Sequence, residues 1–189
     1  MNKLDRVRFM HKAKIAILFL MSVLLIGCAS NGQNGSVSQK KVDAFLNDTQ
    51  EQLEDFITAE EGIVNREEQQ VVVILSGDKS FRHGSAEIRN KGQVVLEKLS
   101  SFLSQSTKST IFVVGHTDST GSAEFNQRLS EQRAVAVTEF FVSQGLGTER
   151  VNSYGVGEWS PIASNEQASG RQENRRIEVR ITPIFDLFK

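Results

Sequence analysis

Runs of apolar residues alternate along this chain with segments in which apolar residues recur every three or four positions. The runs predict β-strands. The run QQVVVIL is so rich in β-branched residues that it is typical of a strand buried on both faces. In the last predicted strand, apolar residues occupy every second position, which is the period of a β-strand. The predicted strands are Gln69–Leu75, Thr110–Gly115, Val151–Val156 and Arg175–Thr182.

The segments with helical spacing lie before and between these strands. Gly145 directly follows the longest of them, in the position that a helix C-cap glycine takes. Because strands and helices alternate in this order, we expect an α/β (α+β) sandwich with a mixed sheet and with helices packed on one side. The predicted helices are Lys40–Thr58, Ser85–Leu103 and Ala123–Gln144, with a brief helical turn at Gln167–Asn174.

The first predicted helix carries an apolar stripe, and an exposed stripe of this size has to be covered. Its members are Val42, Phe45, Leu46, Leu53, Phe56 and Ile57. Two coverings remain open from the sequence: the sheet of the chain's own domain, or a separate partner protein.

The N-terminal residues have the pattern of a secretory signal. A basic segment, residues 1–14, precedes the apolar run Ile15–Ile26, which contains one serine. Twelve helical residues span about 18 Å, less than a hydrocarbon core of about 30 Å. Cys28 is the single cysteine and ends the tetrad Leu-Ile-Gly-Cys. That tetrad resembles a bacterial lipobox, in which the cysteine is lipidated and the chain is cut directly before it.

The lipobox resemblance divides the chain into parts. Residues 1–27 are expected to be a lipoprotein signal peptide, and 28–39 the lipidated cysteine with a flexible tether rich in Gly, Ser, Asn and Gln. Residues 40–65 form the amphipathic helix region, and 66–183 the folded domain. By analogy with lipoprotein sorting, Ala29 indicates export to the outer membrane of a Gram-negative bacterium, with the domain in the periplasm.

The charge balance excludes one class of function. The whole chain has a formal net charge of −1, but the first 27 residues hold five of its 22 basic and one of its 23 acidic residues. The remaining 17 basic and 22 acidic residues give a net of −5. A chain this acidic is a poor candidate for nucleic-acid binding.

The motifs of common cofactor sites are incomplete. Gly155-Val156-Gly157 begins a dinucleotide fingerprint but lacks its third glycine and the long helix that follows. The loop at 115–121 lies between a strand and a helix but lacks the Gly-Lys-Ser/Thr ending of a phosphate loop. His116 and Asp118 would need two further metal ligands that no spacing supplies. The sequence therefore predicts neither a cofactor nor a metal site.

A longer constellation is spread over strands, loops and helices. It comprises Phe81, G-S-A-E at 84–87, G-H-T-D at 115–118, Asn126, L-S-x-x-R-A at 129–134 and N-R-R at 174–176. In these residues the chain resembles, over roughly Val71–Ile181, the OmpA C-terminal-like family, which includes the peptidoglycan-associated lipoproteins and the tail of MotB. That family often has an acidic residue after the phenylalanine, where this chain has Arg82-His83. The resemblance implies an OmpA-like β-α-β-α-β-β domain over 66–183.

The resemblance also implies a function without catalysis. Members of the family bind the peptide stem of peptidoglycan non-covalently, chiefly through meso-diaminopimelate. Of Arg175 and Arg176, which point to opposite faces of a strand, at most one can line such a site. The candidate ligand-binding residues are Phe81, Thr117, Asp118, Asn126, Leu129, Arg133 and Arg175.

Elementary chemistry agrees with a diaminopimelate site. The free end of that amino acid carries an ammonium and a carboxylate on one carbon, so its receptor needs an anion close to a planar cation. Asp118 in a loop and Arg133 on the following helix can supply both, and Asn126 lies on the same helix face as Arg133. The alternative is structural: Asp118 and Arg133 form a local salt bridge, and Asn126 caps or pairs with backbone.

Two functions follow as hypotheses. In the first, the chain ties the outer membrane to the cell wall, with peptidoglycan and, through acylated Cys28, membrane lipid as its partners. In the second, it is a regulatory lipoprotein whose 40–58 helix engages a periplasmic protein, and wall binding modulates that contact. A wall hydrolase is disfavoured, because no spacing suggests an activated nucleophile, a metal-bound water or a carboxylate pair.

Overall fold

The computed structural model describes residues 32–189, so the predicted signal peptide and Cys28 lie outside the described residues. The chain divides into two compact units after Gln39, and the fold below is that of the unit Lys40–Lys189. Helix α2 covers Gly32–Phe56, so residues 32–39, expected in the tether, are helical. A formed helix adds residues at little cost, which lets it extend into a segment of weak propensity.

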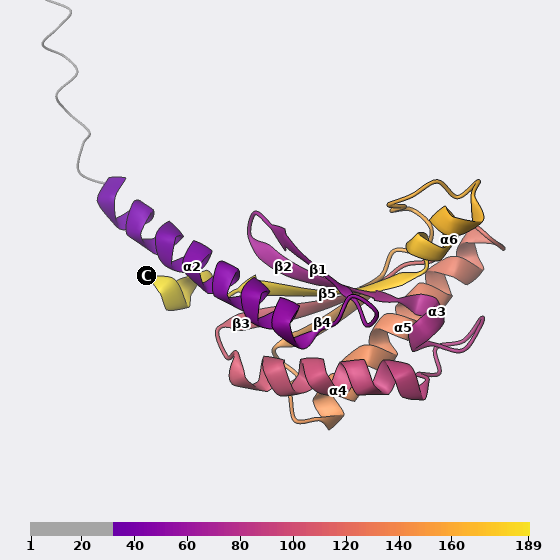
Figure 1. The fold of residues 1–189 in the computed structure, drawn as a ribbon, viewed down its shortest axis with the longest axis horizontal. Helices are drawn as coiled ribbons and strands as arrows, with labels where there is room; N and C mark the ends of the chain where they lie inside the picture. The colour runs from indigo at the N-terminus through magenta and orange to yellow at the C-terminus, as the bar shows by residue number, and fades with distance from the viewer. Residues whose placement is uncertain (1–31) are drawn as a thin grey trace, which may run out of the picture. The chain divides into compact units, whose positions relative to one another are not determined.

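One mixed sheet of five strands forms the centre of the fold (Figure 1). Its order is β1-β2-β5-β3-β4, with β3 and β4 parallel and the other three pairs antiparallel. Because β5 lies between β2 and β3, its start meets the ends of both. The strands are β1 (Ile63–Glu67), β2 (Gln70–Ser76), β3 (Ser109–Gly115), β4 (Val151–Gly155) and β5 (Arg176–Pro183).

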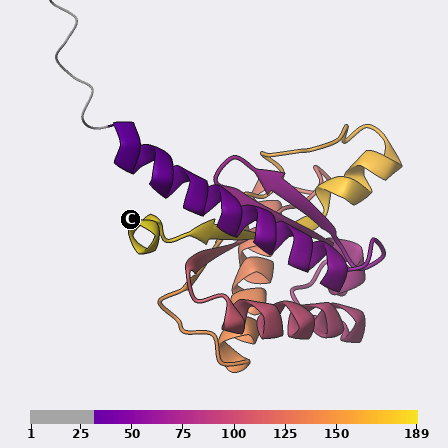
Figure 2. The same ribbon diagram turned by 60° about the vertical axis from the view of Figure 1, so that its left-hand side comes forward.

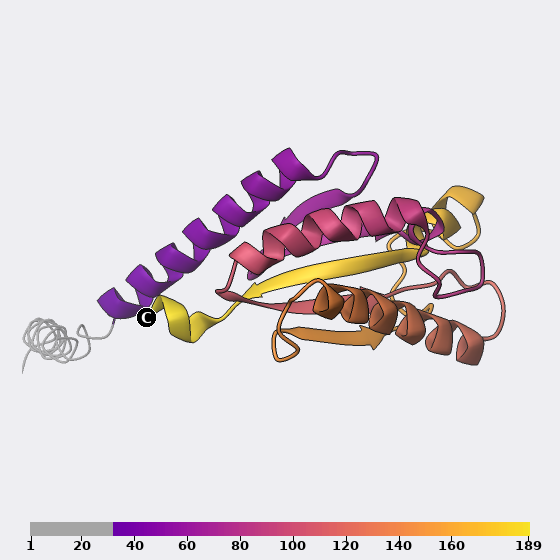
Figure 3. The same ribbon diagram turned by 90° about the horizontal axis from the view of Figure 1, so that it is seen from below.

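The longer helices cover one face of this sheet, as Figure 3 shows for α2, α4 (Asn90–Gln105) and α5 (Ala123–Ser143). The three central strands point buried apolar side chains toward these helices. Each is at most 1% exposed: Val71, Val73, Leu75, Ile111, Val113, Ile177, Val179 and Ile181. Three short helices complete the fold: α3 (Gly77–Ser80), α6 (Ala168–Asn174) and the 3-10 helix η1 (Phe185–Phe188). The predicted α/β (α+β) sandwich, with helices on one side of a mixed sheet, is confirmed.

The apolar stripe of α2 packs on the chain's own sheet. Its buried members Val42, Leu46 and Leu53, with Ile57 just after the helix, join the same hydrophobic core as the central strands, and Phe45 packs against that core. Phe56, expected to be covered with the rest of the stripe, is 44% exposed at the last position of the helix. Figure 2 shows α2 beside the β1–β2 hairpin. Arg66 on β1 pairs with Asp43 on α2 at 3.5 Å. The covering that the sequence left open is thus largely the chain's own domain, which weakens a partner-docking role for this helix.

Two elements differ from the sequence analysis. Strand β1 was not predicted, because its sequence IVNRE has few apolar residues and the strand forms only by pairing with β2. Helix α4 begins at Asn90 rather than at Ser85, because Phe81 and Ile88 form an isolated β-bridge that keeps the chain extended before the helix. The C-cap prediction is confirmed: Gly145 has φ +96°, just after the C-cap residue of α5.

The packing of α2 predicts the effect of truncating its core. Leu53 is fully buried, so Leu53→Ala should lower the free energy of unfolding by about 2–5 kcal/mol. As a matched apolar control, Val94→Ala on the exposed side of α4 should change it by no more than about 0.5 kcal/mol. Urea denaturation followed by circular dichroism measures both. Equal midpoints for Leu53→Ala and the unsubstituted chain would contradict the placement of α2 in the core.

Candidate functional site

A cavity of about 660 Å³ opens at the sheet edge where β2 and β3 end and β5 begins. Its walls come from the segment after β2, the loop after β3, the first half of α5 and the residue before β5. All seven residues singled out from the sequence line it: Phe81, Thr117, Asp118, Asn126, Leu129, Arg133 and Arg175. The structure therefore brings the whole predicted set together, and their role in binding stays a prediction.

Two glycines let α5 lie directly against the strands. Gly115 ends β3, and a Cβ there would stand 2.0 Å from the carbonyl oxygen of Ser130 on α5. Gly155, its partner on β4, would bring a Cβ within 2.3 Å of the Ser130 hydroxyl. Because real Cβ atoms do not come this close, the helix can take this position only over glycines. The contact fixes the part of α5 that carries Asn126 and Arg133 beside the loop after β3.

Asn126 ties that loop to the helix. Its Nδ2 group donates to the carbonyl oxygens of Asp118 and Thr120, both at 3.1 Å, and to the Glu158 carboxylate at 2.6 Å. The side chain is 2% exposed. Its donor group is therefore engaged within the protein, which agrees with the structural alternative for this residue and makes it a positioning residue for the loop.

Arg175 joins the two acidic side chains of the cavity. It donates from Nε and Nη2 to the two carboxylate oxygens of Asp78, at 2.8 and 2.7 Å, and from Nη1 to Asp118. The hydrogen bonds with Asp78, and next with Asp118, raise the pKa of Arg175 despite its burial. Burial alone would raise the pKa of Asp118, but the hydrogen bonds from Arg175 and the Thr120 backbone lower it. Asp118 is therefore held as a carboxylate.

Arg133 is a buried cation that forms no ion pair in the described residues. It is 5% exposed, donates from Nε to the carbonyl oxygen of Ser85 at 2.9 Å, and lies 5.1 Å from the ring centroid of Phe81. Within residues 32–189 it forms no ion pair, and burial lowers the pKa of its guanidinium. The alternative of an Asp118–Arg133 salt bridge is wrong, because Asp118 pairs with Arg175.

Arg176 points away from the cavity. It is buried against Glu178, with Nε at 2.8 Å from one carboxylate oxygen, while Arg180 binds the other. His116 reaches the same carboxylate at 3.4 Å, and burial lowers the pKa of its imidazole. Of the two arginines that the sequence could not separate, Arg175 lines the cavity. Among the described residues, no group of histidines, cysteines and carboxylates could hold a metal ion.

Asp78 was not among the residues predicted from the sequence. This residue lies in α3, just after β2, as Asp118 lies just after β3. Because the ends of β2 and β3 flank the start of β5, both carboxylates reach Arg175. The signal that could have identified Asp78 is its place directly after a buried strand.

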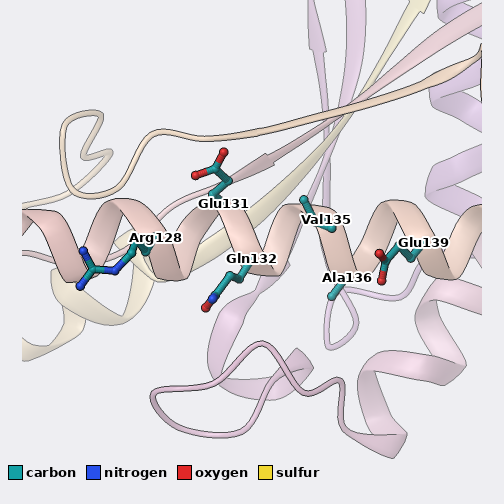
Figure 4. A pocket seen from close by; sticks show the side chains of 6 residues that line it. All are labelled: Arg128, Glu131, Gln132, Val135, Ala136 and Glu139. Carbon is teal, nitrogen blue, oxygen red and sulfur yellow. The ribbon is translucent and has the colours of Figure 1, made fainter.

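A second hollow lies on the outer face of α5 (Figure 4). Its lining consists of Arg128, Glu131, Gln132, Val135, Ala136 and Glu139, all from that one helix. Side chains of a single helix face do not converge on a common point, so we do not take this hollow for the functional site.

The fold is that of a known domain class. The OmpA family matches residues 80–175, so the chain belongs to the OmpA family. Domains of this class bind peptidoglycan and are structural proteins rather than enzymes, in line with the prediction of a module without catalysis. No helix in the described part of the chain is both long and apolar enough to cross a membrane.

Several curated proteins are similar in sequence. Escherichia coli "Probable lipoprotein YiaD" is 34% identical over 121 residues, which are 64% of this chain and 55% of that protein. Outer membrane protein A of Bordetella avium is 36% identical over 58% of this chain and 56% of its own length. The chain thus spans about half the length of these relatives.

Solved structures share the fold. The cell wall anchor of the T6SS from Pseudomonas aeruginosa has a TM-score of 0.61 at 27% identity, over 75% of this chain and 96% of that one. A MotB-like protein from Desulfovibrio vulgaris has a TM-score of 0.72 at 22% identity, over 77% and 95%, and shows the fold alone.

The close contact at Gly115 predicts the effect of one added methyl group. Gly115→Ala forces β3 and α5 apart, and we expect a loss of about 1–3 kcal/mol or more in the free energy of unfolding. Gly147→Ala is the matched control, because a Cβ there meets only the flexible carboxylate of Glu149. Thermal unfolding of both variants measures the difference. Equal stability of the two would contradict the close approach of helix and strand.

Proposed function

We propose that the chain binds peptidoglycan non-covalently through the zwitterionic end of diaminopimelate in the peptide stem. The observation that carries this proposal is Arg133, a buried guanidinium that has no ion-pair partner within residues 32–189, in the same cavity as the carboxylate of Asp118. Burying an unpaired charge is costly unless something else completes the pair. A ligand carboxylate is the group that would complete it.

Each wall of the cavity has a part in the proposed binding. The two terminal nitrogens of Arg133 are available for a forked contact with a ligand carboxylate, which suits a guanidinium better than an ammonium. Asp118 accepts hydrogen bonds from Thr120 and Arg175, and ionised carboxylates have about four acceptor positions. The remaining positions are open to the ligand ammonium. Phe81 and Leu129 are buried and supply apolar wall.

The tether completes the proposed function. Acylation of Cys28 would anchor the chain in the outer membrane, since each buried CH₂ of an acyl chain contributes roughly 0.8 kcal/mol. The domain would then hold the wall from the membrane side. The relationship to a protein named as a probable lipoprotein and to one named as a cell wall anchor supports this arrangement.

Substitutions in the cavity should weaken wall binding. Removing one partner of a buried charge pair costs about 2–5 kcal/mol in binding, and each 1.4 kcal/mol is about tenfold. Asp118→Ala and Arg133→Ala should therefore lower affinity for diaminopimelate-type sacculi by about tenfold to a thousandfold. Arg133→Lys should be nearly as damaging, because it keeps the charge and loses the forked contact. Co-sedimentation of the purified chain with sacculi measures the loss.

The control for this experiment is Arg128→Ala, which removes a cation from the outer face of α5 and should bind as the unsubstituted chain does. Circular dichroism checks that each variant is folded. Full retention on sacculi by folded Asp118→Ala and Arg133→Ala proteins would refute the site.

The anchor is tested separately. Because Cys28 is the single cysteine and ends the apolar run, Cys28→Ser should block lipidation and leave the precursor uncut or the domain mislocalised. Membrane fractionation and metabolic labelling with a fatty acid show the result. Normal outer-membrane fractionation of this variant would contradict the lipobox interpretation.

A further inference from the structure

The cavity wall carries more cations than its acids can pair. Its lining includes five arginines and two aspartates, and both aspartates are engaged by the same arginine, Arg175. The other arginines are Arg82, Arg89, Arg133 and Arg171. One of them, Arg133, is explained by the carboxylate of the proposed zwitterion. The excess of positive charge on the wall remains.

Two of these cations hydrogen-bond only to main-chain carbonyls in the region that the structure describes. Arg89 donates to the carbonyl oxygen of Asp78 at 3.2 Å, and Arg171 to those of Asn165 and Glu166 at 2.8 and 3.0 Å. Such contacts orient a guanidinium without neutralising it. Both charges are therefore available to an anion from outside.

The third cation, Arg82, has an acidic neighbour that is poorly placed to neutralise it. Arg82 and Glu87 are 3.2 Å apart, but their side chains are 68% and 58% exposed. Ion pairs this exposed contribute about 0–1 kcal/mol and are screened by salt. A ligand carboxylate that approaches Arg82 meets a charge that is still largely available.

Arg82 and Arg89 stand together at one end of the cavity. With His83 they also line a neighbouring cavity of about 650 Å³, which reaches to Lys91 at the start of α4. The first turn of α4 holds no acidic residue, so the positive end of the helix dipole adds to the same field. Arg82 and Arg89, the two arginines common to both cavities, form the rim between them.

We infer that the rim binds a second carboxylate of the wall peptide, so that the site prefers stems whose acid groups are free over stems in which they are amidated. The inference rests on the proposed function, because it needs the zwitterionic end of the same peptide in the cavity. The ligand class is a peptide with one ammonium and at least two free carboxylates. Such a ligand matches the charges of the cavity. Both aspartates bind the same arginine, Arg175, and several other arginines of the wall have no acidic partner in the described residues.

The stem has two sources for the second carboxylate. Glutamate joined through its γ-carboxyl keeps a free α-carboxylate, and the last residue of the stem keeps its terminal one. Three synthetic N-acetylated tripeptides, acetyl-Ala-γ-Glu-diaminopimelate, which carry a single ammonium, separate them: the free acid, the form amidated at glutamate, and the form amidated at the terminal carboxyl. Fluorescence anisotropy of a labelled tripeptide, with the others as competitors, gives their relative affinities for the full chain.

The free acid should bind about tenfold more tightly than one of the two amides, and the sensitive amide identifies the source. In Arg89→Gln and Arg82→Gln the ratio of acid to amide affinity should fall toward one. Arg128→Gln, which removes a charge outside both cavities, should keep the ratio of the unsubstituted chain.

The possible results distinguish a failure of this inference from a failure of the proposed function on which it rests. If the affinities of the chain for the free acid and for both amides agree within twofold, the rim does not bind a carboxylate. The inference is then wrong, while the proposed function stands. If it binds none of the three peptides, the proposed function fails. If the preference for the acid persists in both rim variants, other residues read the carboxylate and the assignment to Arg82 and Arg89 is wrong.

Discussion

The arrangement of the site depends on Arg175 between two carboxylates. This side chain joins Asp78 after β2 to Asp118 after β3, and it precedes β5, so one cation connects three strands at one edge of the sheet. The pairing engages both acids of the cavity and keeps Asp118 ionised. In consequence Arg133 is buried without an acidic partner in the described residues. The same network that orders the loops thus leaves the buried cation Arg133 for a ligand carboxylate to neutralise.

Most of the fold could be predicted from sequence patterns because most of its elements bury apolar side chains. Strand β2 and helix α5 are examples, since their periods reflect contacts with the core. Elements that form through pairing alone could not be predicted. Strand β1 has Ile63 58% exposed and depends on β2, and the chain before α4 is extended by the Phe81–Ile88 bridge. What covers the apolar stripe of α2 also could not be predicted, because the spacing of apolar residues does not identify the surface that packs against them.

The residues of the candidate site could be predicted from a family resemblance. The ion pairs that they form with one another could not. Sequence spacing placed Asp118 and Arg133 near each other, and it could not show that Asp118 pairs with Arg175 instead. That partner lies 57 positions away along the chain and is brought in by the order of the strands. Asp78 was missed for the same reason, since no local motif marks it. Contacts between distant segments follow from topology, which spacing does not encode.

The central claim is that the guanidinium of Arg133 receives the carboxylate of a zwitterionic ligand while Asp118 accepts its ammonium. A crystal structure of the chain with meso-diaminopimelate tests this directly. The account predicts a ligand carboxylate on both terminal nitrogens of Arg133, with the ammonium on Asp118 and the contacts of Arg175 to both aspartates intact. A ligand carboxylate bound to Arg175 or Arg171 instead, with Arg133 still bonded only to the carbonyl of Ser85, would contradict it.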